Sequence, residues 1–488
     1  MTHRLTSAAT LSDNVLRPAY RREDHGAGIV HIGLGAFHKA HQAVYTDDAL
    51  AVSGGDWRII GVSLRSTTAA EELTPQNGLY TIIERDTQGS RARVIGALTA
   101  ALSLQADRPA VLHALCSPAT RIVSLTVTEK GYGIDRTTGG VNPDHPAIAA
   151  DLADPDTPQG VAGLLVWALK ARRAAGTEPF TVLCCDNLPE NGPLVRSFLI
   201  DFARRAAPDL VAHIESEVAF PATMVDRITP ARGTETLKLA EDMTGLRDAA
   251  AIECEAFRQW VIEDNFPQGR PDWSAGGALF VEDVRPFEEM KLRMLNGTHS
   301  MLAYSGFLAG HTYVRDVMAD PALAHLVRRH LAAAAATLAP LSGVDLGTYA
   351  EDLARRFANP HLGHETYQIA MDGSEKMPQR IFAPALDALK RGQSIEAFAF
   401  AAAAWMRYTL GQKDDGSTYE LRDPMQIALQ VRPVPKSADG IISHLNSITG
   451  LGPDALKDST AWQAALARNL DIMLTRGMRT AIDNAAAG

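Results

Sequence analysis

The chain has 488 residues, 46% of them hydrophobic and 21% charged, which is enough for the cores of two or three domains and excludes disorder throughout. Its formal net charge of −10 argues against nucleic acid and anionic membranes as partners. Residues 1–24 lack the apolar core of a signal peptide, and the most apolar windows, 331–340 and 398–406, are too short to cross a bilayer. We expect a cytoplasmic protein, a monomer or small homo-oligomer, whose partners are small molecules.

A βαβ unit opens the chain. A β-prone run at 28–32 leads into a glycine-rich turn and a helix-like stretch to about Val52, and a second strand follows at 57–62. Continuous apolar runs at 121–127 and 180–185, with a helical segment at 160–175 between them, are typical of parallel strands buried on both faces. Weaker strand candidates lie at 222–228 and 280–284.

The character of the sequence changes near Arg285. Beyond it the chain is rich in Ala and Leu with helical periodicity, in segments at 301–310, 322–338, 345–357, 385–391, 395–408 and 461–485. The predicted fold class is therefore α/β, with a Rossmann-type, doubly wound dinucleotide-binding domain over residues 1–285. A mainly α-helical domain over residues 286–488 is expected to supply substrate-binding and catalytic groups.

The turn after the first strand is the candidate cofactor site. In Gly33-Leu34-Gly35-Ala36-Phe37, a GxG pair lies between a strand and a helix, where a pyrophosphate can approach backbone N–H groups. His38 occupies the position of the usual third glycine, so the pair by itself also fits a plain tight turn. We predict that residues 33–37 bind a dinucleotide.

The end of the second strand bears on the choice of dinucleotide. A Rossmann domain normally carries Asp or Glu there to hold the ribose hydroxyls, but Ser63-Leu-Arg65-Ser-Thr-Thr68 has no carboxylate. Arg65 and the nearby hydroxyls could instead accommodate a 2′-phosphate. From these residues the choice between NAD and NADP is open. The four cysteines have neither CxxC nor Cys/His spacing, so no metal is expected.

The segment 291–300 carries the candidate catalytic groups. Pro286 and the acidic pair after it indicate a helix start. At about 100° per residue, three polar side chains lie within about 140° of Lys291 on an α-helix, those of Glu288, Asn296 and His299. Because burial lowers the proton affinity of an amine, such a lysine can act as a general base. The alternative is a snorkelling lysine beside satisfied core residues.

Several segments, in this order, resemble one family: 33–42, 124–132, 185–192, 224–230, 255–264, 291–300 and 372–376. They are similar to the polyol-specific long-chain dehydrogenases, the mannitol dehydrogenase family, which includes mannitol 2-dehydrogenase and the hexuronate reductases. The resemblance covers nearly the whole chain. It implies a metal-independent oxidoreductase with a nicotinamide cofactor and a Rossmann-type domain joined to a helical one.

The resemblance also implies roles for individual residues. Lys291 corresponds to the catalytic base, and Asn187 and Asn296 to the pair that holds the reacting oxygen. This fits the chemistry, because a base takes the hydroxyl proton while carboxamide N–H groups stabilise the developing alkoxide. The remaining correspondences are substrate-orienting His299 and Lys376, Asp226 near the site, and Glu288 and Glu129 on a proton path.

Three positions favour a sugar acid over a polyol. Gln368, Arg258 and Arg293 depart from the mannitol-oxidising pattern and are similar to the fructuronate reductase branch. A guanidinium can bind the carboxylate of a uronate or aldonate bidentately, with Arg380 as a third candidate. We predict interconversion of D-mannonate and D-fructuronate with NAD(H). The alternatives are a mannitol 2-dehydrogenase or arabinitol dehydrogenase, a decarboxylating 3-hydroxy acid dehydrogenase, and a catalytically silent nucleotide sensor.

Overall fold

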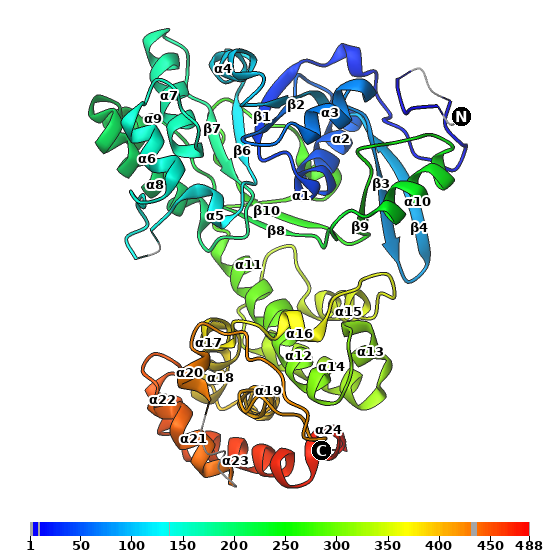
Figure 1. Cartoon of the computed structure of the whole chain (residues 1–488), viewed down its shortest axis with the longest axis vertical. Coiled ribbons are helices and arrows are strands. Elements are labelled where there is room, and N and C mark those ends of the chain that lie inside the picture. The colour runs from blue at the N-terminus through cyan, green and yellow to red at the C-terminus, as the bar shows by residue number, and fades with distance from the viewer. Residues whose placement is uncertain (1–2, 8–9, 136, 431–436, 488) are drawn as a thin grey trace. The chain divides into compact units, whose positions relative to one another are not determined.

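The computed structural model describes residues 3–7, 10–135, 137–430 and 437–487. The chain folds into two compact units, Met1–Arg285 and Pro286–Gly488. Within the described residues, all β-strands belong to the first unit and the second consists of helices joined by loops (Figure 1). The predicted fold class, a Rossmann-type α/β domain plus a mainly helical domain, is confirmed.

A five-stranded parallel sheet forms the centre of the first unit, in the order β5-β2-β1-β6-β7. Its strands are β1 (Ala27–Ile32), β2 (Arg58–Ser63), β5 (Leu98–Ser103), β6 (Ile122–Leu125) and β7 (Thr181–Cys184). After β5 the chain crosses to the other side of β1 to form β6. The carboxyl ends of β1 and β6 therefore flank the topological switch point, where ligands of open α/β sheets bind.

Both faces of this sheet are covered, which explains the continuous apolar runs. Alternate residues of β1 enter opposite cores: Val30 and Ile32 pack in the core that includes α7 (Val161–Ala174) and α8 (Asn191–Ala206). Ile29 packs in the other core, with side chains of α2 (Gln42–Ser53). A strand enclosed by helices on both faces has no polar face to present, so its sequence does not alternate.

Two smaller sheets complete the first unit. One has the order β4-β3-β9 and the other β11-β10-β8. Their strands are β3 (Tyr80–Asp86), β4 (Gly89–Ile95), β8 (Thr223–Asp226), β9 (Ile252–Glu255), β10 (Gln259–Glu263) and β11 (Leu279–Val281). The sequence indicated β8 and β11 weakly and missed β3, β4, β5, β9 and β10. The remaining α-helices of this unit are α1 (Ala36–Ala40), α3 (Thr68–Leu73), α4 (Arg108–Cys116), α5 (Glu129–Tyr132), α6 (Pro146–Ala153), α9 (Val211–Glu217) and α10 (Thr234–Thr244).

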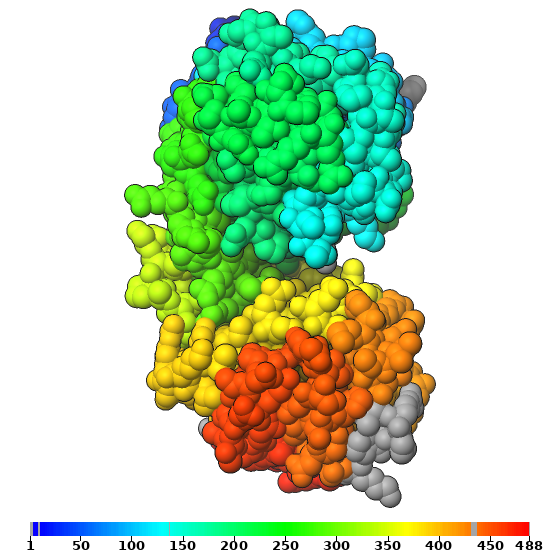
Figure 2. All heavy atoms as spheres, turned by 90° about the vertical axis from the view of Figure 1, so that its left-hand side faces the viewer, coloured from blue at the N-terminus to red at the C-terminus, as the bar shows by residue number. Residues whose placement is uncertain are grey.

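The second unit is built around α12 (Gly297–Leu308) and α19 (Glu396–Tyr408), which pack together and are almost wholly buried. The other α-helices are α11 (Arg285–Met290), α13 (Val314–Ala319), α14 (Pro321–Ala336), α15 (Leu346–Phe357), α16 (Thr366–Ile369), α17 (Gly373–Met377), α18 (Ala383–Lys390), α20 (Gln426–Leu429), α21 (Ala438–Ser447), α22 (Asp454–Lys457), α23 (Thr460–Thr475) and α24 (Gly477–Ala487). The face of this unit seen in Figure 2 is formed mainly by its later segments, in yellow, orange and red.

The expected single helix at 461–485 is two helices. Gly477, at φ +83°, begins α24 directly after α23 has ended. A residue in this left-handed region cannot continue an α-helix, and glycine adopts it without steric cost. The break was not predicted, because the apolar residues keep a helical period on both sides of it.

Two π-helical turns interrupt the helices of the second unit. They are Lys291–Asn296 (η5) and Pro378–Phe382 (η6), and they pack against each other. The α-helical angles expected around Lys291 are therefore wrong across this turn. Because a π-turn hydrogen-bonds i to i+5, it takes up nearly one more residue than an α-turn. Lys291 and Asn296 consequently lie more nearly one above the other than the sequence periodicity implied.

Candidate active site

The first glycine of the cofactor turn is required by the fold. Gly33 has φ +104°, and a Cβ at this position would lie 2.2 Å from the carbonyl oxygen of Thr126. At Gly35, by contrast, a Cβ would meet only the Gly33 oxygen, at 3.7 Å. The space beside Gly35 at the start of α1 is thus open, at the switch point of the sheet. A dinucleotide phosphate fits such a position, because backbone N–H groups can reach it without side-chain obstruction.

A stacked histidine pair stands where the third glycine is missing. The rings of His31 and His38 lie 3.4 Å apart between centroids, and both side chains are fully buried. The His31 nitrogens lie 2.8 Å from the hydroxyls of Ser124 and Thr126. Burial lowers the pKa of His31 to about 3, so the ring is neutral at pH 7. Nothing in the sequence indicated this stack beyond the presence of two histidines near the turn.

The residues after the turn belong to the same binding region. Leu34 packs against Gly61 of β2, where a Cβ would lie 2.6 Å from a Leu34 methyl. Ala36 and Phe37 begin α1. Arg65 is exposed just beyond β2. Across 63–68 the polar groups are hydroxyls and this guanidinium, with no carboxylate to hold ribose hydroxyls.

The carboxyl ends of β6 and β7 are tied together by Asp186. Its carboxylate accepts hydrogen bonds from the backbone N–H groups of Val127 and Thr128, at 3.0 and 3.1 Å, and from the Tyr132 hydroxyl, at 2.7 Å. These bonds join the segment after β6, where exposed Glu129 begins α5, to the loop after β7, where exposed Asn187 lies. Both candidates therefore lie at the same edge of the parallel sheet as Gly33. Asp226 is buried at the end of β8, in another sheet.

In the second unit, the candidate groups lie on η5 and the start of α12. Lys291 and His299 are buried, each with 9% of its surface exposed, and Asn296 is half-buried. The backbone carbonyl of Asn296 accepts hydrogen bonds from Ser300 Oγ at 3.2 Å and from the guanidinium of Arg380 at 3.3 Å. Glu288 is half-buried on α11, one residue before Glu289. The π-turn thus connects to the second π-turn through Arg380.

Apart from Arg380, the groups around His299 were not indicated by the sequence. Its ring centroid is 4.7 Å from that of Phe357 and 5.3 Å from that of His364. Burial, assisted by His364 and the nearby guanidiniums of Arg356 and Arg380, lowers the pKa of His299 well below its usual value. A neutral imidazole at pH 7 has one donor and one acceptor nitrogen, which suits orientation of a substrate hydroxyl.

Lys376 and Arg380 are neighbours on α17 and η6. Lys376 Nζ donates to the Met371 carbonyl at 2.5 Å and lies 3.7 Å from the Asp372 carboxylate. Burial and the repulsion from Arg380 lower the pKa of Lys376. Arg380 also lies 3.4 Å from Ser300 Oγ, and its Nε has no hydrogen-bond partner. Among the described residues, no carboxylate lies within 4 Å of the Arg380 guanidinium.

The two arginines favoured by sequence each have a carboxylate partner within their own unit. Arg258 pairs with Asp48 at 2.6 Å and lies over the ring of Tyr45. Arg293 pairs with Asp387 at 2.6 Å and with Glu289, and it donates to the Thr337 carbonyl. Gln368 is exposed on α16. The structure thus brings Asn296, His299, Lys376 and Arg380 together. The guanidinium of Arg293 is instead paired with Asp387 on α18.

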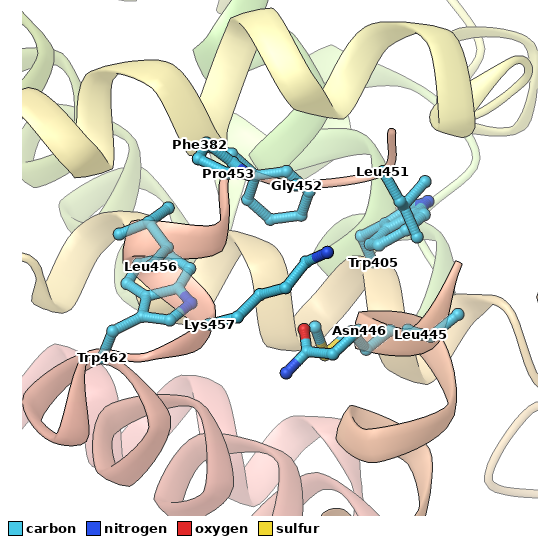
Figure 3. Close-up of a pocket in the computed structure, with 11 residues that line it drawn as sticks. Phe382, Trp405, Leu445, Asn446, Leu451, Gly452, Pro453, Leu456, Lys457 and Trp462 are labelled. Atoms are coloured by element: carbon cyan, nitrogen blue, oxygen red, sulfur yellow. The ribbon is translucent and has the colours of Figure 1, made fainter. Parts of the chain in front are cut away.

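A small pocket elsewhere in this unit does not compete as a substrate site. It lies between Phe382, Trp405 and Trp462, with Lys457 reaching into it (Figure 3). Its volume is about 20 Å³, which holds one water and no sugar.

Among the described residues there is no group of three or more His, Cys, Asp or Glu side chains able to hold a metal. None of the helices in the described part of the chain combines the length and the hydropathy that a membrane span requires.

Known proteins resemble this chain over nearly its full length. Residues 27–275 match the mannitol dehydrogenase Rossmann domain, and residues 283–473 match the mannitol dehydrogenase C-terminal domain. D-mannonate oxidoreductase of Escherichia coli (strain K12) is 41% identical over 473 residues, which cover 96% of this chain and 97% of the relative. Mannitol 2-dehydrogenase of Cereibacter sphaeroides is 41% identical over 426 residues, covering 86% and 89%.

A solved structure agrees with these matches. Pseudomonas fluorescens mannitol 2-dehydrogenase, in a ternary complex with NAD and D-mannitol, is 37% identical, with a TM-score of 0.79 and 99% of each chain covered. The two family models match the glycine-turn unit and the lysine-bearing unit in the order that the sequence motifs predicted. The chain therefore belongs to the mannitol dehydrogenase family of oxidoreductases.

Proposed function

We propose that the protein is an NAD(H)-dependent, metal-independent oxidoreductase that interconverts D-mannonate and D-fructuronate. The observation that supports a sugar acid is Arg380, a guanidinium without a carboxylate partner beside Asn296, His299 and Lys376. A partly buried cation of this kind is costly unless something neutralises it. The carboxylate of an aldonate or uronate would do so, whereas a polyol has no charge to offer.

The chemistry assigns each group a task. In the oxidising direction, the secondary hydroxyl gives its proton to unprotonated Lys291 Nζ as its carbon gives up a hydride. Bound NAD supplies the hydride acceptor. The carboxamides of Asn187 and Asn296 donate to the oxygen and stabilise its negative charge until the carbonyl forms. In reduction, the Lys291 ammonium returns the proton.

The other predicted residues support this reaction. His299 and Lys376 orient substrate hydroxyls, and Asp226 and Gln368 add polar contacts. Glu288 and Glu129 pass the proton between Lys291 and solvent. The cofactor is assigned to Gly33, Leu34, Gly35, Ala36 and Phe37, with Arg65 beside the ribose.

The substrate assignment is tested by initial rates with D-mannonate, D-altronate, D-mannitol and D-arabinitol, each with NAD and with NADP. We expect the highest kcat/KM with D-mannonate and NAD. Polyol oxidation is the second candidate, because the mannitol 2-dehydrogenase is as similar in sequence as the D-mannonate oxidoreductase. Robust mannitol turnover with none on mannonate would replace the proposal by this candidate.

Arg380→Gln tests how the acid is recognised. Loss of a charged hydrogen bond should raise KM for D-mannonate by roughly 10- to 100-fold, and KM for mannitol, where it turns over, by much less. Arg258 and Arg293 are the alternative candidates for binding the substrate carboxylate. Arg258→Gln and Arg293→Gln therefore serve as matched control variants. We expect both to lower stability through their lost aspartate pairs without separating the two substrates. A selective KM effect in either of them, and none in Arg380→Gln, would move carboxylate recognition to that arginine.

A further inference from the structure

A second cavity in the helical unit lies apart from the groups described above. Five helices, α12, α14, α19, α23 and α24, enclose a volume of about 340 Å³. Small-molecule sites typically measure about 300–1,000 Å³. At roughly 30 Å³ for each water-sized unit, this one has room for on the order of ten non-hydrogen atoms.

The lining combines an apolar body with a polar rim. Met301, Leu326, Phe400, Ile472 and Ala481 supply apolar surface. The rim carries Arg329, Asn469, Asn484 and the ion pair of Arg468 with Glu396. Glu396, Arg468 and Asn484 are exposed, so the cavity opens to solvent at this rim.

His330 provides a buried polar group with unused hydrogen-bonding capacity. Its Nδ1 lies 2.9 Å from the hydroxyl of Thr298, which fixes the ring, and its ring packs edge-on against Phe398. The side chain lines the cavity and is 1% exposed, and its Nε2 has no hydrogen-bond partner. Burial lowers the pKa of His330 to about 4, so the imidazole is neutral at pH 7. An unmatched buried nitrogen of this kind is costly unless a partner arrives.

Arg329, the next residue on α14, supplies charge. Its guanidinium donates to the Ala485 carbonyl, and among the described residues no carboxylate lies within 4 Å of it. The neighbouring Arg328 is exposed, does not line the cavity and lies 3.9 Å from Glu351. The cavity thus offers a cation at its rim and a neutral hydrogen-bonding group in its wall.

We propose that this cavity is a binding site for a small organic monocarboxylate whose apolar body carries a hydroxyl or carbonyl group. The carboxylate binds Arg329, the body fills the space between Met301, Phe400 and Ile472, and the polar group hydrogen-bonds to His330 Nε2. A hydroxyl can serve either tautomer of the imidazole, because it donates and accepts.

The probe is 4-hydroxybenzoate, measured on the full chain by isothermal titration calorimetry. We expect saturable binding, weakened about 10-fold or more by Arg329→Gln and unchanged by Arg328→Gln. The uncharged 4-hydroxybenzyl alcohol, and benzoate, which lacks the hydroxyl, should each bind more weakly. His330→Phe should abolish the preference for 4-hydroxybenzoate over benzoate, which loss of packing alone would not do.

Three outcomes would overturn the proposal. One is no saturable binding at about 10 mM probe, a concentration that would reveal a millimolar Kd. Another is equal binding to the Arg329→Gln and Arg328→Gln proteins. The third is loss of binding in Arg380→Gln with Arg329→Gln unaffected, which would place the probe at the candidate active site. NADH titration by fluorescence with each variant shows that the chain remains folded.

Discussion

The two units prepare for chemistry in different ways. In the first, the candidate cofactor turn is built from backbone: Gly33 is fixed by a close approach to Thr126, and Gly35 leaves space for a phosphate. In the second, the candidate catalytic groups are side chains, and they lie on two π-turns, η5 and η6, and on the helices next to them, α12 and α17. Backbone recognition demands little beyond small residues, whereas side-chain catalysis depends on the angular position of every group.

The histidines at the two candidate sites also differ. In the first unit, His31, His38 and His41 are fully buried near the turn, and their neighbours are structural groups such as Ser124 and Trp260. In the second unit, His299 keeps part of its surface exposed and has guanidiniums nearby. At the candidate active site, partial exposure and neighbouring cations suit the His299 ring to a ligand.

The largest expected effect is in the second unit. Lys291→Ala should lower kcat by about 10²- to 10⁴-fold, because the reaction would lose its proton acceptor, while NADH affinity stays within about 2-fold. Stopped-flow hydride-transfer rates and fluorescence titration measure the two quantities. Lys457→Ala, in the small pocket of Figure 3, is the matched control and should keep normal kcat. Near-normal turnover of Lys291→Ala would remove this lysine from the base role.

In the first unit, Gly33 and Gly35 are expected to have different roles, one in folding and the other in cofactor binding. Gly33→Ala should cost more than about 2 kcal/mol of stability, because a non-glycine residue at φ +104° is strained and its Cβ would overlap the Thr126 oxygen. Gly35→Ala should leave the free energy of unfolding nearly unchanged and weaken NADH binding about 10-fold or more. Denaturant titration and NADH fluorescence separate the two outcomes. If Gly35→Ala binds NADH normally, the cofactor does not approach the backbone there.

The smallest expected effect is a pH dependence in the first unit. Burial lowers the pKa of His41 to about 3, so below pH 6.5 the unfolded chain takes up a proton that the folded chain does not. Stability conferred by the neutral ring is therefore full at pH 7 and falls as the pH drops from about 6.5 towards 3, by up to about 1.4 kcal/mol per pH unit.

His41→Phe should remove that contribution to the slope, although it costs stability at pH 7 by losing the hydrogen bond to the Gln259 carbonyl. Unfolding followed by tryptophan fluorescence at about pH 7.5 and 5.5 measures the slope, since Trp260 packs against His41. An unchanged slope would show that folding does not lower the pKa of His41.

Part of the fold was predictable because local physics decides it. Strands β1, β2, β6 and β7 are short apolar runs, which are typical of parallel strands that are buried on both faces. Strand β5 was missed because Leu-Thr-Ala-Ala-Leu-Ser has no strong strand preference and is extended only through pairing with β2. Arg258 and Arg293 were predicted to bind the substrate carboxylate. The sequence could not distinguish them from structural arginines, because their partners Asp48 and Asp387 are far away in the chain.

The sequence by itself determined the family, the parallel sheet, the glycine turn and the identity of the residues that can transfer a proton. Residue type and order carry that information. The tertiary structure alone decided that Lys291 begins a π-turn, that His38 replaces a glycine by stacking on His31, and that Arg380 lies beside Asn296 without an acidic partner. These outcomes depend on packing between segments distant in the chain, and a helical or strand period describes only a segment's own neighbours.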